Sequence, residues 1–352
     1  MRAVVLVGGQ GTRLRPLTET VKKELLPLVD RTILDHTLDR LVRHGVHEVV
    51  MSSPYLEEAF DPLIEARGGE PDITWITEEQ ALDTGGAIVH ALHRLDPAQP
   101  FFALNGDILT DLDMTAMLAV HRDRDAAATI ALHHVEDARP FGLVDLAPDG
   151  RILAFREKPE VAIPGDVNAG TYVFDPEALA AWTADRPISV EREIFPEIID
   201  SGRPVVGFDS HAYWRDLGTP ENYLQAHFDL LDGKVRGRSY PAPWIAGSAR
   251  VDLRAHLGRW VAVGAGASIA AEAQIDDSVI HPGATVGPGA RVLGSIVGPG
   301  ARVGEGATLT GCVLGEGSTV PGGLSLDGSR VAPGAVAPGA VDATDTTDAA
   351  DA

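Results

Sequence analysis

The chain has 352 residues, 44% of them hydrophobic, and carries 51 acidic against 29 basic side chains, a formal net charge of −22. This length predicts two or three domains with cores of their own, and the apolar fraction excludes a disordered chain. Because no basic stretch offsets the negative charge, we expect no binding to nucleic acid or to an anionic membrane surface. An anionic substrate would have to be held by a few locally placed cations.

The cysteine count and the N-terminus indicate a compartment. The single cysteine, Cys312, cannot form an intramolecular disulfide, which suits a reducing environment. The apolar run within Met1–Val7 is too short for a signal peptide, and no run of about 18 apolar residues occurs elsewhere. We therefore expect a cytoplasmic protein with no membrane partner.

The first 230 or so residues alternate short apolar strands with helical patterns. Ala3–Val7 is an unbroken apolar run that enters a Gly-rich turn, as expected of a buried parallel strand. A helical pattern follows, then a strand at Glu48–Met51, and a further strand at Phe101–Asn105 stops at Gly106-Asp107. This order predicts an α/β fold with a mostly parallel sheet between helices. Ligands bind beyond the carboxyl ends of such strands, so Gly8–Arg13 and Asp107 should share one edge.

A repeat begins beyond the polar linker that follows Leu231. Segments 278–294, 295–311 and 312–328 align without a gap, with aliphatic residues recurring at steps of five or six. Such six-residue units grouped in threes predict a parallel β-helix of triangular section, with about 18 residues per coil. Residues 341–352 carry four aspartates among alanines and threonines and predict a disordered acidic tail. The expected domains are an α/β domain at 1–232, a linker at 233–246, a β-helix at 247–340, and the tail.

The segment Gly8–Thr18, directly after the first strand, is the strongest local signal. Its closely spaced glycines let backbone N–H groups approach a phosphate, and Arg13 adds a charged, forked donor. The segment is not a P-loop, because the four-residue spacer and the Lys-Ser/Thr pair are absent, and it lacks the dinucleotide-binding fingerprint. Taken alone, it would also be explained by a tight strand-to-helix turn with a solvated arginine.

This segment resembles the signature of the sugar-1-phosphate nucleotidylyltransferases, also called NDP-sugar pyrophosphorylases. That signature continues into Pro-Lys-Pro before a Leu-Pro, where this chain reads Lys22-Lys23-Glu24-Leu25-Leu26-Pro27. Lys23 matches the signature lysine, both flanking prolines are replaced, and Lys22 becomes a competing candidate for its role. The resemblance is closest to the mannose-1-phosphate guanylyltransferases that carry a β-helix. It implies a Rossmann-like nucleotidyltransferase domain followed by a left-handed β-helix of hexapeptide repeats.

Two further motifs match the family's metal ligands. Asn105-Gly106-Asp107 matches the strand-ending aspartate, and Trp214–Tyr223 matches the segment that supplies a second carboxylate, Asp216. The resemblance implies that Asp107 and Asp216 together hold Mg²⁺, which prefers oxygen ligands. Spacing alone does not link two residues this far apart. The implied catalytic residues are Arg13, Lys23, Asp107 and Asp216.

Three motifs between the aspartates resemble the family's sugar-phosphate site. Phe141-Gly142-Leu143-Val144 resembles the aromatic-Gly-Val-Val turn beneath the sugar, and Asn168-Ala169-Gly170 resembles the sugar-binding turn. Glu157-Lys158-Pro159 resembles the Glu-Lys-Pro motif, in which the lysine binds the sugar phosphate and the glutamate a hydroxyl. The implied sugar-phosphate ligands are Gly142, Glu157, Lys158, Asn168 and Gly170.

The loop Glu79–Ala87 resembles the base-binding loop of the GTP-using branch. A carboxylate near the base has a physical rationale, because guanine presents N1–H and N2–H₂ donors on one edge and a carboxylate only accepts. The chain departs from the family loop at Ala81 and Asp83, where Pro and Gly are usual. The implied nucleotide-binding residues are Leu6, Gly8, Gly9, Gly11, Thr12, Glu79, Thr84 and Gly85.

The resemblance implies that the phosphate of a sugar 1-phosphate attacks the α-phosphorus of GTP, giving a GDP-sugar and pyrophosphate with Mg²⁺ as cofactor. Mannose 1-phosphate is the expected acceptor, with heptose 1-phosphate or a cyclitol phosphate such as valienol 1-phosphate as alternatives. A further alternative is a regulatory homologue that binds a nucleotide-sugar without turning it over. Since every implied catalytic residue precedes residue 224, the β-helix is expected to form a homo-oligomer rather than to serve the chemistry.

Three other residues bear on alternatives. His281 lies in a repeat corner, where some hexapeptide-repeat acyltransferases carry a catalytic histidine, but we expect it to face the solvent without such a role. Cys312 occupies the repeat position of Ser278 and Ser295, which predicts a small packed residue. Trp214 is expected to pack beneath Asp216.

Overall fold

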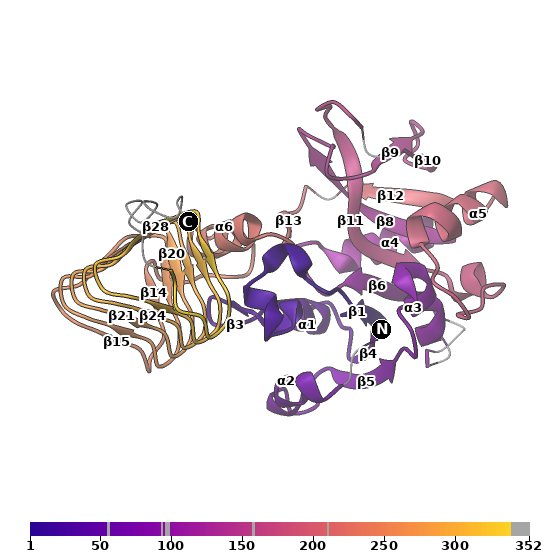
Figure 1. The fold of residues 1–352 in the computed structure, drawn as a ribbon. Coiled ribbons are helices and arrows are strands. Elements are labelled where there is room, and N and C mark those ends of the chain that lie inside the picture. The colour runs from indigo at the N-terminus through magenta and orange to yellow at the C-terminus, as the bar shows by residue number, and fades with distance from the viewer. Residues whose placement is uncertain (55–56, 93, 96–98, 157–158, 210, 339–352) are drawn as a thin grey trace, which may run out of the picture. The chain divides into compact units, whose positions relative to one another are not determined.

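The computed structural model describes residues 1–54, 57–92, 94–95, 99–156, 159–209 and 211–338, shown in Figure 1. The chain forms two compact units, each built from separate segments. The first unit comprises Met1–Gln10, Arg31–Leu217 and Val235–Gly237, and the second comprises Gly11–Asp30, Gly218–Lys234 and Arg238–Ala352. The domain boundaries expected from the sequence follow the chain, whereas these units combine distant parts of it. Among the described residues, no helix is long and apolar enough to cross a membrane.

The described part of the first unit is organised around a nine-stranded sheet. Its main path runs β10-β9-β11-β6-β1-β4-β5, with β8 beside β11 and β12 beside β8. Strands β6, β1, β4 and β5 are mutually parallel, as the sequence predicts, while β11 runs antiparallel to β6, β8 and β9. The strands are β1 (Arg2–Leu6), β4 (Glu48–Ser53), β5 (Asp72–Thr77), β6 (Phe101–Asn105), β8 (Ala128–Val135), β9 (Leu143–Leu146), β10 (Ile152–Arg156), β11 (Gly165–Phe174) and β12 (Val205–Asp209).

Helices cover this sheet because both of its faces are apolar. Ala3, Val4 and Val5 alternate between the faces of β1 and are all fully buried. Val4 packs in a core with Ile88 of α3 and Phe195 of α5. The helices of this unit are α1 (Ile33–Arg43), α2 (Asp61–Ala66), α3 (Asp83–Leu92), α4 (Met114–Asp123) and α5 (Phe195–Asp200), and its remaining short strands are β3 (Arg31–Thr32), β7 (Ile108–Thr110) and β13 (Trp214–Asp216).

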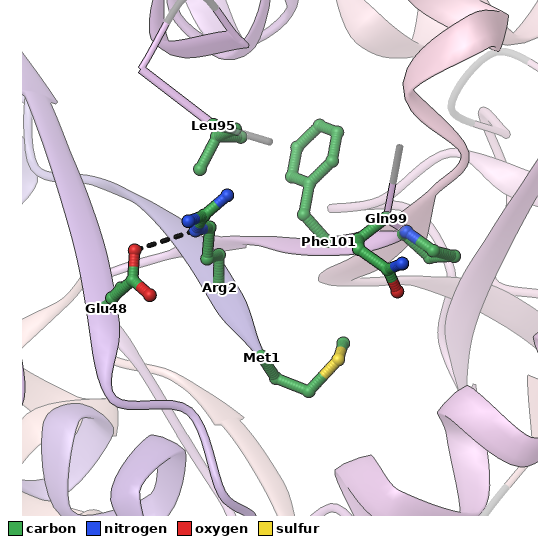
Figure 2. A pocket seen from close by; sticks show the side chains of 7 residues that line it. Met1, Arg2, Glu48, Leu95, Gln99 and Phe101 are labelled. Carbon is green, nitrogen blue, oxygen red and sulfur yellow. Dashed lines mark hydrogen bonds and ion pairs between the residues drawn. The ribbon is translucent and has the colours of Figure 1, made fainter. Parts of the chain in front are cut away.

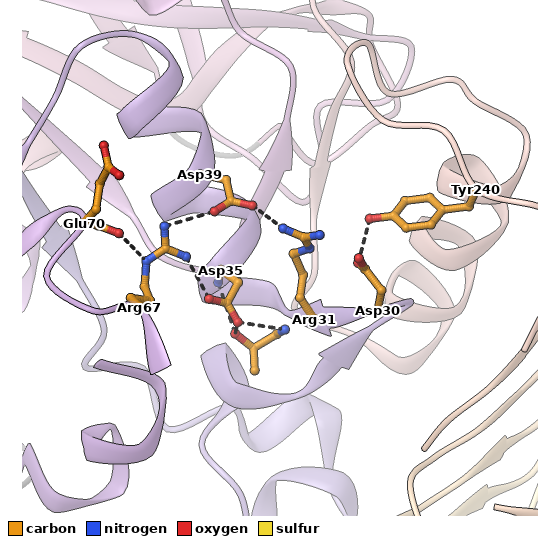
Figure 3. Close-up of polar contacts among 8 residues, drawn as sticks. Asp30, Arg31, Asp35, Asp39, Arg67, Glu70 and Tyr240 are labelled. Carbon is orange, nitrogen blue, oxygen red and sulfur yellow. Dashed lines mark hydrogen bonds and ion pairs between the residues drawn. The ribbon is translucent and has the colours of Figure 1, made fainter. Parts of the chain in front are cut away.

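An ion-pair network fixes the start of α1, as Figure 3 shows. Arg67 bridges two carboxylates of this helix, at 2.9 Å from Asp35 and 3.0 Å from Asp39. Arg31 pairs with the other oxygen of Asp39 at 2.5 Å. Asp35 also completes a capping box with Thr32, so the first turn is held by both backbone and side-chain bonds. The chain that follows the signature segment thus enters α1 in a fixed direction.

A buried histidine on α4 predicts a pH dependence of stability. His121 is 3% exposed, its Nδ1 lies 3.0 Å from Thr129 Oγ1, and burial lowers its pKa to about 4. The unfolded chain takes up this proton near pH 6.5, so stability is complete above that pH and declines as the pH falls toward 4. Between about pH 7.5 and pH 5 the loss should be about 2 kcal/mol.

Urea unfolding at the two pH values checks this expectation. His121→Gln should lose about 2 kcal/mol less than the native chain on acidification, since glutamine does not titrate. His47→Gln is the matched control, because His47 is 62% exposed. An unchanged pH dependence in the His121 variant would contradict the assignment.

The described part of the second unit contains three sheets of parallel strands, drawn in orange to yellow in Figure 1. Each coil contributes one strand to each sheet. In the first sheet, one residue of each coil pairs with its equivalent in the next coil, in the order Val263, Ile280, Val297, Leu314 and Val331. These positions are 17 residues apart, so the repeat read from the sequence is the coil of the β-helix. Three parallel sheets around an aliphatic core confirm the predicted fold, a left-handed β-helix.

The strands of the first sheet are β14 (Trp244–Ile245), β17 (Val261–Val263), β20 (Ser278–Ile280), β23 (Ile296–Val297), β26 (Val313–Leu314) and β29 (Arg330–Val331). The second sheet contains β15 (Arg250–Val251), β18 (Ser268–Ile269), β21 (Thr285–Val286), β24 (Arg302–Val303) and β27 (Thr319–Val320). The third contains β16 (His256–Leu257), β19 (Gln274–Asp276), β22 (Arg291–Leu293), β25 (Thr308–Thr310) and β28 (Ser325–Asp327). Strand β2 (Pro27–Leu28) and helix α6 (Pro220–Leu231) complete the unit.

Cys312 packs as the sequence predicts. It is fully buried, and its backbone N–H donates to Ser295 Oγ at 2.9 Å, just as that of Ser295 donates to Ser278 Oγ at 3.0 Å. Burial raises the pKa of the Cys312 thiol, which disfavours the reactive thiolate. A small residue that accepts from the next coil therefore explains this position without redox chemistry.

Candidate functional site

Asp107 and Asp216 occupy neighbouring positions at the carboxyl edge of the first unit's sheet. Strands β7 and β13 pair antiparallel with Asp216 opposite Ile108, and the backbone N–H of Leu217 donates to the carbonyl of Asp107 at 3.2 Å. Both aspartates are half-buried. Tertiary structure therefore brings the backbones of two aspartates together that sequence spacing could not connect.

This pair of carboxylates suits a hard divalent cation. Such ions take oxygen ligands, and Mg²⁺ is commonly held by one or two carboxylates together with substrate phosphates. Among the described residues, no group of three or more histidine, cysteine or acidic side chains could enclose a metal by itself. The donor set thus fits a metal that completes its coordination with the substrates.

The turn Asn168-Ala169-Gly170 packs directly on the strands that flank Asp107. Gly170 has φ +68°, and a Cβ there would lie 2.5 Å from Ile108 Cδ1 and 2.7 Å from Asn105 Nδ2. Asn168 Oδ1 accepts from the Gly170 N–H at 2.9 Å, while its Nδ2 donates to Tyr172 Oη and Glu191 Oε1. Only glycine fits at this turn, and Asn168 is held in a fixed orientation.

Trp214 joins the two sugar-motif turns to the strand that carries Asp216. Its indole N–H donates to the carbonyl of Ala169 at 3.0 Å, and its ring meets the edge of Phe141 with centroids 5.5 Å apart. Sequence reasoning predicted only packing beneath Asp216 and missed this bridging role. The sequence did contain a signal, because Trp214 lies two residues before Asp216 and residues two apart on a strand share one face. The adjoining Gly142 is also tightly placed, because a Cβ there would lie 3.1 Å from the carbonyl oxygen of Arg156.

A glutamate that sequence reasoning did not single out holds the start of the loop Glu79–Ala87 in place. Glu78 is 6% exposed and accepts from Ser52 Oγ at 2.9 Å and from the Leu82 N–H at 3.0 Å. Its neighbour Glu79 is exposed. Glu78 thus shapes the loop, and Glu79 keeps its carboxylate accessible.

The departure from the family loop at Asp83 is accommodated by the backbone. Asp83 has φ +58°, the left-handed region that favours glycine but that aspartate also tolerates, and its Oδ1 accepts from the Thr84 N–H at 2.7 Å. Thr84 Oγ1 accepts from the Val190 N–H at 3.3 Å. The Gly85 N–H donates to the Ile188 carbonyl at 2.8 Å, so a direct bond from this amide to a nucleotide would have to replace that contact.

The signature segment is divided between the two units. In the first unit, Leu6 is half-buried at the end of β1, and a Cβ on Gly8 would lie 2.8 Å from Pro54 Cδ. Gly9 is exposed beside it. The tight approach at Gly8 explains why that position lacks a side chain.

The second unit contains the rest of the signature. Gly11 has φ +60°, and its carbonyl accepts from Thr18 Oγ1 at 2.7 Å. Thr12 and Arg13 follow on an exposed 3-10 turn, whereas Lys23 is only 7% exposed and Lys22 is half-buried. Of the two competing lysines, Lys23 is therefore the more desolvated. Glu157 and Lys158 lie outside the described residues.

A pocket lies at the opposite edge of the sheet. Its volume is about 230 Å³, and it lies at the amino ends of β1, β4 and β6, where Arg2 pairs with Glu48 at 2.7 Å. Figure 2 shows the side chains that line it. Ligands of parallel sheets bind at the carboxyl ends of the strands. This pocket is therefore not the candidate site.

The prediction that His281 faces the solvent is wrong. Its side chain is buried against α6, only 1% exposed, with Nε2 3.0 Å from Tyr223 Oη. Burial lowers its pKa to about 4, so the imidazole is neutral at ordinary pH. A histidine enclosed in this way cannot meet an acyl donor, which removes the rationale for acyl transfer at this corner.

Comparison with known proteins agrees with this arrangement. Residues 2–233 match the family model described as Nucleotidyl transferase, and residues 240–337 match the GMPPB C-terminal domain. Mannose-1-phosphate guanylyltransferase of Mycobacterium tuberculosis is 37% identical over 79% of this chain and 79% of its own length. The catalytic subunit beta of the Danio rerio enzyme of the same name is 34% identical, over 74% of this chain and 73% of its own.

Among solved structures, HddC from Yersinia pseudotuberculosis complexed with GMP-PN is similar, with a TM-score of 0.55 and 26% identity. The match covers 64% of this chain and 97% of HddC. The family model spans more than half of the chain, and the two guanylyltransferases each cover about three quarters of it. The chain therefore belongs to the nucleotidyl transferase family.

Proposed function

We propose that this protein transfers the guanylyl group of GTP to mannose 1-phosphate, giving GDP-mannose and pyrophosphate. The observation that carries the proposal is the ladder of β7 and β13, which sets the backbone of Asp107 beside that of Asp216, with the turn at Gly170 packed against Ile108 of β7. Relatives named mannose-1-phosphate guanylyltransferase support this choice of nucleotide and acceptor. A non-catalytic homologue and the heptose or cyclitol acceptors are not favoured by these relatives.

The reaction requires no covalent bond to the protein. A phosphate oxygen of the acceptor attacks the α-phosphorus, the bond from that phosphorus to the bridging oxygen breaks, and pyrophosphate leaves with the electron pair. Catalysis then depends on positioning and on neutralising charge. Members of this family generally use a divalent metal ion, and Asp107 and Asp216 would hold Mg²⁺, which would supply positive charge to offset the phosphates.

The remaining roles go to residues of the signature and the sugar motifs. Arg13 and Lys23 would offset charge on the phosphates and on the departing pyrophosphate, and Lys158 would orient the acceptor phosphate. Asn168, fixed by its bonds to Tyr172 and Glu191, would present the remaining lone pair of its Oδ1 to a sugar hydroxyl. The proposed triphosphate cradle comprises Gly8, Gly9, Gly11 and Thr12.

Guanine selectivity is proposed to depend on Glu79. Glu79→Gln should lower kcat/KM for GTP by about 10- to 100-fold, because guanine donors lose their acceptor, at a cost of about 1 to 3 kcal/mol. Its kcat/KM for dTTP should stay nearly constant, which makes dTTP an internal control. Gln80→Ala is the matched control on the same exposed loop. Equal use of GTP, dTTP and UTP by the native protein would contradict the proposed selection of guanine.

Acceptor choice is tested by pyrophosphate release with GTP and three acceptors. Mannose 1-phosphate should exceed heptose 1-phosphate and valienol 1-phosphate in kcat/KM by more than about a hundredfold, near 2.7 kcal/mol. A preference for valienol 1-phosphate or heptose 1-phosphate would replace the proposed acceptor while leaving guanylyl transfer intact.

We also propose that the β-helix assembles a homo-oligomer, which sedimentation of the full chain checks.

A further inference from the structure

The β-helix contacts the signature segment at its catalytic end. Arg330, on the last described strand β29, donates from Nη1 to the carbonyl of Arg15 at 3.0 Å and to that of Arg13 at 3.4 Å. Both carbonyls belong to the exposed turn that carries the Arg13 side chain. A charged donor shared between two carbonyls fixes the direction of the backbone on either side of Leu14.

A second, buried contact holds the other end of the segment. Tyr223 of α6 donates its hydroxyl hydrogen to the carbonyl of Pro27, and His281 of the β-helix lies 3.0 Å from the same hydroxyl. Burial raises the pKa of Tyr223 well above its ordinary value, so the phenol keeps its proton. Since Pro27 can only accept, the tyrosine hydroxyl must accept in turn from the Nε2–H of neutral His281.

Two further bonds support this end. The backbone N–H of Val29 donates to His227 Nδ1 of α6 at 3.3 Å, and Tyr240 Oη donates to Asp30 at 2.7 Å, as Figure 3 shows. The segment from Gly11 to Asp30 is thus held near both ends by α6 and the chain beyond it. Lys23 lies between the two sets of contacts, close to Gly11, where an added Cβ would lie 3.4 Å from Lys23 Cβ.

We propose that the β-helix is a positioning element of the active site, in which Arg330 and the pair His281–Tyr223 hold the signature segment in its catalytic conformation. This inference rests on the proposed function only for the roles of Arg13 and Lys23. It differs from the expectation that the β-helix serves assembly alone. Groups that stabilise a transition state must be held before the reaction starts, so a loosened segment should lower kcat more than it raises KM.

The test compares Arg330→Ala, Arg330→Lys and the matched control Arg302→Ala. Arg302 is exposed on β24, and its side chain makes no hydrogen bond or ion pair within the described ranges. Arg330→Ala should lower kcat about tenfold with KM for GTP within about twofold, since the substrate contacts themselves remain. Arg330→Lys should recover part of the loss, because an ammonium still donates to one carbonyl. Arg302→Ala should match the native protein.

Hydrogen exchange of peptides covering residues 11–30, in protein without substrates, gives a readout independent of activity. Arg330→Ala should raise exchange around residues 12–16, and Tyr223→Phe should raise it around residues 27–30. If exchange and kcat of Arg330→Ala equal those of Arg302→Ala, the positioning role is wrong. If the native protein transfers no guanylyl group but exchange rises as expected, the proposed function fails and the positioning contact stands.

Discussion

Asp107→Asn and Asp216→Asn should each lower turnover by at least two orders of magnitude while the fold is retained. Each change removes one negative charge from the proposed metal site and keeps the side-chain shape. The hydrogen bond between Leu217 and Asp107 involves only backbone atoms, so the ladder of β7 and β13 should survive. Pyrophosphate release under saturating GTP and mannose 1-phosphate measures the effect, and the thermal midpoint verifies folding.

Asp145→Asn is the matched control for these variants. Asp145 lies on β9 and pairs with Arg156 at 2.8 Å, with both side chains more than a third exposed. Exposed pairs of this kind contribute about 0 to 1 kcal/mol, so its turnover should stay close to native. Retention of more than about a tenth of native turnover by either site variant, under about 1.4 kcal/mol of barrier, would contradict the metal-site assignment.

Lys23→Gln should have the second-largest effect, lowering kcat by about a hundredfold or more, near 2.7 kcal/mol. An ammonium that is 7% exposed acts in a medium of low effective dielectric, where it stabilises developing negative charge more strongly than a solvated one does. Glutamine keeps much of the length and the polarity but removes the charge.

Lys22→Gln separates the two lysines that compete in the altered signature. Lys22 is half-buried, so its loss should change kcat by no more than about threefold. Steady-state kinetics of both variants with GTP settles the question. A larger loss for Lys22→Gln than for Lys23→Gln would transfer the role to Lys22 and show that the missing prolines re-aim the loop.

Local periodicity predicted the β-helix well, because each coil repeats the same short pattern and pairs with the next. The register of Ile280, Val297 and Leu314 follows directly from the 17-residue alignment, and the packing of Cys312 follows from its place in that repeat. The parallel strands β1, β4 and β6 were equally visible as apolar runs. The sequence did not reveal that β11 runs antiparallel to its neighbours, because strand direction depends on a long connection and not on composition.

Contacts between distant segments lay beyond sequence reasoning. His281 occupies a corner that resembles every other corner in the repeat, and its burial depends on Tyr223 of α6, 58 residues away. Likewise, nothing in the pattern of residues 11–30 indicates that Arg330 would reach their carbonyls. The sequence could not separate the roles of Glu78 and Glu79, since adjacent glutamates differ only in their burial in the folded chain.

Formation of GDP-mannose from GTP and mannose 1-phosphate is the decisive measurement for the proposed reaction. We expect equimolar GDP-mannose and pyrophosphate from the native protein, abolition by EDTA, recovery with Mg²⁺, and no product from the double variant Asp107→Asn/Asp216→Asn. Product made equally well in EDTA, or by the double variant, would contradict the role of the paired aspartates. No GDP-mannose from the Mg²⁺-loaded native protein would contradict the proposed reaction.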